Sequence, residues 1–118
     1  MSRTFTQIRA FSSDGTLIHN FFRVPKGKSA IVDMIINVGY SYGGDGKISI
    51  GIAATLTKAD GSSGSILADR FIPNIDGSLR VLRLERCALE SEDTISVNVS
   101  TNSGVVFSTS VYLGGVLQ

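Results

Sequence analysis

The closest match to a catalytic motif lies at residues 39–43, where Gly39-Tyr40-Ser41-Tyr42-Gly43 satisfies the G-x-S-x-G pattern of a hydrolase nucleophile. That chemistry needs a strand, a sharp turn and a helix, with an acid and a histidine later in the chain than the serine. Here a glycine-rich turn and another strand-like stretch follow, and the single histidine, His19, precedes Ser41. The pattern therefore favours the end of a strand that carries two tyrosines over an active site.

The other residues with catalytic or metal-binding chemistry are isolated or lack the spacing of ligands. His19 has no cysteine or carboxylate at zinc-ligand spacing. Cys87 has no base beside it, so a buried structural thiol is favoured over a nucleophile. Glu90, Glu92 and Asp93 could bind calcium, but the spacing of an EF-hand is missing and a solvated turn is the alternative. We therefore expect no enzymatic activity, no cofactor and no bound metal.

Length and composition place this chain among compact single domains. Its 118 residues, of which 42% are hydrophobic, suffice for one core over 1–118, and its lone cysteine cannot form an intramolecular disulfide. The net charge of +1, from 11 basic and 10 acidic residues, argues against a nucleic-acid binder. Neither a signal-peptide core nor an apolar run of about 18 residues is visible, so we expect synthesis in a cytoplasm and no membrane contact.

Apolar and polar residues alternate along much of the chain, which is the two-residue period of strands with one buried face. The clearest case is residues 48–56, where Ile, Ala and Leu side chains alternate with small or polar ones. About eight strands are expected, over residues 4–11, 16–24, 29–42, 47–58, 65–72, 78–86, 94–100 and 105–113. A change of phase between Val81 and Leu82 predicts a β-bulge at that point.

Two pairs of neighbouring strands are predicted to form hairpins. Residues 94–100 and 105–113 are joined by a polar turn at 101–104, and pairing them keeps every apolar position on one face. Asp14-Gly15 is a hairpin signal between the first two strands. Turns every 8–12 residues or so are typical of sandwiches, so the expected fold is an all-β, antiparallel β-sandwich of the jelly-roll type. An immunoglobulin-like sandwich is the alternative, although its buried tryptophan and cysteine pair are missing.

Several side chains are candidates for contacts with other subunits. Residues 16–24 are apolar on both faces, which predicts that one face meets the core and the other a second subunit. Arg80 and Arg83 belong to a basic group that could form salt bridges across a subunit contact or protect a solvated strand edge. With the aromatic residues that usually anchor interfaces, the candidates are Phe21, Phe22, Tyr40, Tyr42, Tyr112, Arg80 and Arg83.

Three segments, about a third of the chain, resemble known virion or trimer-head domains. Residues 22–32, FRVPKGKSAIV, are similar to the strand, Val-Pro-x-Gly-Lys, strand pattern of phage decoration and tail-fibre domains. Residues 89–97, LESEDTISV, resemble the Leu-x-x-Gly-Asp-x-Ile-x-Val step of the same domains, with Glu92 where glycine is usual. Residues 107–117 are similar to the last strand of tumour-necrosis-factor-like and complement-like trimer heads.

The resemblance implies a small jelly-roll virion protein of a tailed bacteriophage, which works as a homo-oligomer, a trimer before a dimer. The leading hypothesis is a capsid decoration or cement protein, made in the host cytoplasm and located in the virion. Its partner there would be the major capsid protein or another virion protein. The alternative is a fibre-head module that binds a carbohydrate or receptor through the loops at 43–46 and 59–64, with Tyr40 and Tyr42 against the glycan.

Overall fold

The computed structural model describes residues 2–13, 16–39, 49–73, 79–101 and 107–118, and of residues 11–13 and 16–19 only the backbone. Eight strands account for most of these residues, close to the expected bounds. They are β1 (Arg3–Ser13), β2 (Thr16–Arg23), β3 (Ala30–Gly39), β4 (Ile50–Thr57), β5 (Ser63–Phe71), β6 (Leu79–Leu89), β7 (Thr94–Thr101) and β8 (Phe107–Leu117). In the described part of the chain, no helix has the length and apolar character needed to cross a membrane.

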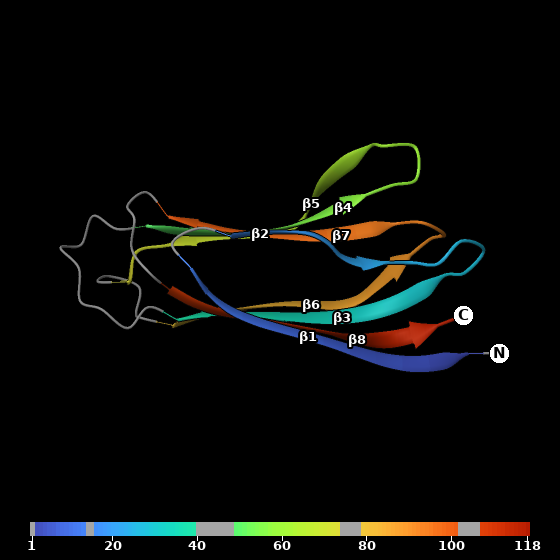
Figure 1. The fold of residues 1–118 in the computed structure, drawn as a ribbon, viewed down its shortest axis with the longest axis horizontal. Helices are drawn as coiled ribbons and strands as arrows, with labels where there is room; N and C mark the ends of the chain where they lie inside the picture. The colour runs from blue at the N-terminus through green and yellow to red at the C-terminus, as the bar shows by residue number, and fades with distance from the viewer. Residues whose placement is uncertain (1, 14–15, 40–48, 74–78, 102–106) are drawn as a thin grey trace.

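The strands form two four-stranded antiparallel sheets that lie face to face as the two layers of a sandwich (Figure 1). Sheet A has the strand order β1-β8-β3-β6, and sheet B has the order β2-β7-β4-β5. The pairs β1–β8, β2–β7, β3–β6 and β4–β5 are nested, so the chain resembles one long hairpin rolled into two layers. This eight-strand topology is a jelly roll, and the predicted fold class is confirmed rather than the immunoglobulin-like alternative.

Both predicted hairpins are wrong. β7 pairs with β2 and β4 in sheet B, whereas β8 lies between β1 and β3 in sheet A. β1 and β2 also lie in different sheets, so Asp14-Gly15, which is outside the described residues, does not join a paired hairpin. Alternation specifies which face of a strand is buried but not which strand it pairs with. Two strands that face the same core from opposite sheets therefore show the pattern of a hairpin.

The core lies between the sheets and collects the inward-facing side chains. On β3, Val32, Met34, Ile36 and Val38 are buried, and the residues between them face outwards. The same alternation buries one face of β4, β7 and β8, as the sequence pattern predicts. Each such side chain contributes roughly 1.5–3 kcal/mol when it is fully removed from water, so these rows fix which face of each strand turns inwards.

The β-bulge in β6 lies further along the strand than predicted. Val81 and Leu82 pair regularly with Asn37 and Ile36, and the register shifts instead between Val32 and Met34 on the partner strand. At the shift, Arg86 has a φ of 53°, and its amide donates a hydrogen bond to Asp33 Oδ1 over 2.8 Å. The apparent change of phase arises because Val81 is an outward-facing apolar residue on an edge strand.

Candidate assembly interface

Two of the predicted interface aromatics are engaged within the chain. Phe21 is only 3% exposed and belongs to the core, which leaves no surface for a partner to contact. Phe22 is half-buried and stacks on Phe5, with 4.9 Å between the ring centroids and 8° between the ring planes. The side chain of Gln7 in β1 donates a hydrogen bond to the carbonyl of Phe21. The apolar side chains of Phe21 and Phe22 thus close the β1–β2 side of the sandwich.

The two predicted arginines have different positions. Arg80 faces the other sheet: its Nε lies 3.2 Å from Asp69 Oδ2, and its guanidinium carbon lies 5.3 Å from the centroid of the Phe71 ring. Arg80 therefore ties β6 to β5 on the side of the sandwich opposite β1 and β2. Arg83 is exposed on the outer face of sheet A, directly opposite Ile35 on β3. Arg83 thus remains available to a partner, as does Tyr112.

The outer face of sheet A, here called the sheet A face, holds all the large exposed hydrophobic side chains of the described residues. These are Ile8 on β1 (68% exposed), Tyr112 on β8 (38%), Ile31 on β3 (41%), and Leu79 and Val81 on β6 (62% and 39%). Their outward direction follows from the pleat, because each occupies the phase opposite to the core-facing residues of its sheet. Sequence alternation marked Tyr112 as outward-facing, but only the strand order brings these five residues onto one surface.

Tyr112 lies along its own strand rather than projecting into solvent. A Cβ atom built on Gly114 would come within 2.6 Å of Tyr112 Oη and 3.1 Å of Cζ, so the ring covers this glycine. An aromatic ring over a glycine in a neighbouring same-face position compensates for the missing side chain. The ring therefore lies across Gly114 and leaves part of its surface exposed to a partner.

The outer face of sheet B has a different character. Its outward-facing residues on β4 and β7 are small or polar: Gly51, Ala53, Thr55, Thr57, Thr94, Ser96, Asn98 and Ser100. A shallow hollow of about 410 Å³ lies on this face, bordered by Asp69, Arg70, Asn98 and Ser100. Arg70 Nη1 donates a hydrogen bond to Ser49 Oγ over 3.1 Å. Sheet B thus offers hydrogen-bonding groups where sheet A offers apolar surface.

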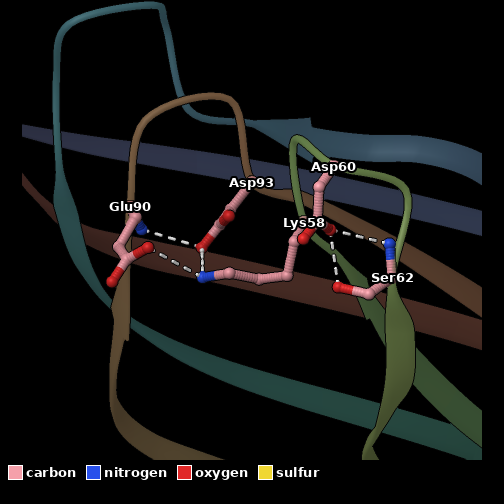
Figure 2. Close-up of polar contacts among 5 residues, drawn as sticks. All are labelled: Lys58, Asp60, Ser62, Glu90 and Asp93. Atoms are coloured by element: carbon pink, nitrogen blue, oxygen red, sulfur yellow. Dashed lines mark hydrogen bonds and ion pairs between the residues drawn. The ribbon is translucent and has the colours of Figure 1, made fainter.

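The acidic cluster that was a calcium candidate is organised around a lysine (Figure 2). Asp93 is 1% exposed, and its Oδ2 accepts hydrogen bonds from the amide of Glu90 (2.8 Å) and from Lys58 Nζ (2.9 Å). Lys58 Nζ also lies 3.2 Å from Glu90 Oε2. The hydrogen bond to Asp93, followed by that to Glu90, raises the pKa of Lys58. The ammonium group occupies the place of a cation, and no group of three metal-ligating side chains occurs among the described residues.

Main-chain hydrogen bonds extend this cluster to a third segment. The amide of Val24 donates to the carbonyl of Asp93 over 2.9 Å, and the amide of Glu92 donates to the carbonyl of Val24 over 3.1 Å. Arg23 Nη2 lies 3.2 Å from Glu92 Oε1. The cluster therefore holds the turn between β6 and β7 against the end of β2 and the end of β4. The role of this cluster is structural. Sequence spacing could not indicate it, because Lys58 is far in the chain from Glu90 and Asp93.

The turn between β4 and β5, expected as an exposed loop at residues 59–64, is closed by its own hydrogen bonds (Figure 2). Asp60 Oδ1 accepts from the hydroxyl (2.6 Å) and the amide (2.9 Å) of Ser62, and these bonds lower the pKa of Asp60. Gly61 adopts a φ of 91°, a conformation that favours glycine. The polar groups of this turn are thus largely used within the chain.

The remaining chemical candidates give no catalytic arrangement within the described residues. Burial raises the pKa of the Cys87 thiol, which packs at the margin of the core and is protonated at neutral pH. Tyr40, Ser41 and Tyr42 lie outside the described residues, as does the side chain of His19. The expectation that residues 39–43 end a strand rather than form an active site, and the loop expected at 43–46, therefore stay predictions.

Comparison with known proteins adds evidence on the fold. No family model matches the chain, and neither does any curated protein. A chain in the acid-stable capsid structure of the Helicobacter pylori bacteriophage KHP30 is 9% identical, with a TM-score of 0.54, and the match covers 98% of this chain and 93% of that one. Infectious bursal disease virus gives further matches: the Gx strain with a TM-score of 0.53 at 17% identity, and the Gt strain with 0.50 at 17%.

The two kinds of neighbour differ in how much of each protein is matched. This chain spans 33% of the length of the infectious bursal disease virus chains but nearly all of the phage chain. At these identities the likeness shows the fold, a jelly roll of the kind found in viral capsid chains. It is consistent with the resemblance to small jelly-roll virion proteins noted from the sequence.

Proposed function

We propose that this chain is a non-enzymatic structural protein of a bacteriophage virion, of the capsid decoration or cement type. The observation that carries the proposal is the match to the phage capsid chain over 98% of one chain and 93% of the other. The matched phage chain comes from a capsid structure, and this chain covers nearly all of its length. The sheet A face supports the same role because aromatic, aliphatic and arginine side chains gather on one exposed surface, as they do at protein interfaces.

A cement protein works by burying surface at junctions between shell subunits, so it needs a rigid body and adhesive faces. The two-layer core supplies the rigid body, and the cluster around Lys58 holds the turns at one end. Tyr112 and Arg83 are the predicted interface residues that remain exposed in the described part of the chain. Partners would be further copies of this chain and the major capsid protein, with the virion as the location.

The first test of this role is the molar mass of the purified protein by light scattering across a size-exclusion peak. We expect a dimer or trimer, with two or three times the 12.5 kDa of one chain, because the exposed apolar surface favours association. The assembled protein should then co-sediment with capsids of its own phage and raise the temperature at which they open. A stable monomer that neither binds nor stabilises these capsids would contradict the proposal.

The alternative function is a fibre-head module that binds a carbohydrate or receptor. The observation that favours it is the shallow hollow on sheet B, where Asn98, Ser100 and Arg70 offer hydrogen-bond donors and acceptors. A glycan array with the wild-type chain tests this reading, with Asn98→Ala and a Tyr40→Ala/Tyr42→Ala pair as variants. Sugar binding that these variants abolish would support the alternative, and an array without reproducible binding would exclude it for the sugars tested.

A further inference from the structure

We propose that the sheet A face is the surface through which two copies of this chain pair about a two-fold axis, with a ridge on each copy seated against the groove of the other. The inference rests on the self-association in the proposed function and names the face that carries it. Three observations support a second copy as the occupant: the relief of the face, its charges and its area.

The relief of the face follows from the strand register. Ile8, Tyr112, Ile35 and Arg83 are direct cross-strand neighbours and form a ridge of large side chains across all four strands. The next outward row consists of Thr6, Gly114 and Asp33, followed by the bulged residues Glu85 and Arg86 of β6. A shallow hollow of about 270 Å³ lies beside the bulge, bordered by Asp33, Ile35, Arg83 and Glu85. The sheet A face therefore has a ridge across its four strands and an adjacent groove beside β3 and β6, next to the glycine that the Tyr112 ring covers.

The ridge and the groove are complementary to those of a second copy when the two copies are related by a two-fold axis. This axis lies between the two rows, parallel to the sheet and perpendicular to the strands. Such an axis places the ridge of one copy over the groove of the other and repeats each contact twice, as in an isologous interface. Tyr112 leans from the ridge over Gly114 in the groove row, so the two Tyr112 rings would meet at the axis. Aromatic rings in offset or edge-to-face contact add to the stability that burial provides.

The charges on the face favour the same arrangement. Arg83 stands in the ridge, and Glu85, the next outward residue on β6, stands in the groove. The axis places Arg83 of each copy against Glu85 of the other, which gives two opposite-charge contacts. Asp33 adds a second acidic side chain to the groove row near Arg83, so that the row carries two carboxylates and one basic side chain, Arg86. A flat apolar face without charged residues would accept many partners. Complementary charges in the ridge and the groove instead favour one alignment of the two copies.

The area of the face suits a dimer. Four strands at their usual spacing, each about ten residues long, cover roughly 600 Å² per copy. Face-to-face packing would bury roughly 1,200 Å² in total, at the lower end of the range for specific protein interfaces. The outer face of sheet B has a similar extent but lacks a ridge of large side chains, so it does not favour the same packing.

A charge-reversal cycle tests the pairing directly. Arg83→Glu and Glu85→Arg are each expected to weaken the dimer about 10- to 100-fold, measured as the dissociation constant by analytical ultracentrifugation. The double variant Arg83→Glu/Glu85→Arg should recover most of the affinity because the two contacts are restored with reversed sign. Both positions are exposed, so the melting temperature of the monomer serves as the control for folding.

The outcomes separate this inference from the proposed function. Loss of the dimer in both single variants and its recovery in the double variant supports the pairing. An oligomer whose mass none of the variants changes would overturn the pairing, because its interface must lie elsewhere, while leaving the virion role intact. A wild-type chain that stays monomeric at all concentrations would also overturn the pairing. Capsid co-sedimentation then decides independently whether the proposed function survives.

Discussion

Replacing Gly115 by alanine is expected to lower the free energy of unfolding by about 3 kcal/mol and the melting temperature by roughly 10–20 °C. Gly115 lies on β8, a central strand of sheet A, opposite Phe5 on β1 and Val32 on β3. A Cβ atom at this position would collide with the carbonyl oxygen of Ile31 and lie 2.9 Å from Val32 Cα. These are backbone atoms held between paired strands, so relief requires β8 and β3 to separate.

Gly64→Ala is the matched control for this prediction. Gly64 is exposed on β5, and a Cβ atom there would meet no other atom within 4 Å. Its φ is not in the left-handed region, so the substitution is expected to change the free energy of unfolding by less than about 0.5 kcal/mol. Chemical denaturation followed by circular dichroism gives both values. Equal losses in the two variants would show that the close approach of β8 and β3 is not what restricts Gly115.

Replacing Asp93 by alanine is expected to lower the free energy of unfolding by about 3 kcal/mol. The carboxylate is buried and receives hydrogen bonds from both the Glu90 amide and the Lys58 ammonium group. Its removal leaves an N–H group and a partly buried ammonium group without their main acceptor, and such losses exceed the value of an exposed ion pair. The turn between β6 and β7 would also lose its buried link to the end of β4 and keep only the exposed pair of Lys58 with Glu90.

Glu90→Ala controls for the loss of negative charge beside Lys58. The side chain of Glu90 is 80% exposed, and exposed ion pairs contribute little because water and salt screen them. We expect the free energy of unfolding to fall by less than about 0.5 kcal/mol, measured by denaturation under the same conditions. If Glu90→Ala were as destabilising as Asp93→Ala, charge alone would explain the effect, and the buried hydrogen bonds would have no special role.

The candidate site was only partly accessible from the sequence. Tyr112 could be placed on an outward face because its neighbours Val111 and Leu113 are apolar in the opposite phase. The apolarity of β2 at Phe21 and Phe22 has an explanation within the chain, because Phe21 packs in the core and Phe22 stacks on Phe5 at the side of the sandwich. Arg80 and Arg83, three residues apart on one strand, face opposite directions, and pairing with Asp69 decides the role of Arg80.

The sequence by itself determined the number of strands, their approximate bounds and, for β3, β4, β7 and β8, the face that turns inwards, since these depend on the two-residue period of the backbone. The tertiary structure alone decided which strands pair: β8 with β1 and β3, and β7 with β2 and β4. Three of the four nested pairs join segments far apart in the chain, and only β4–β5 is a local hairpin. The local sequence pattern does not specify pairing between distant segments. The ridge on sheet A and the burial of Asp93 beside Lys58 therefore depend on the tertiary structure.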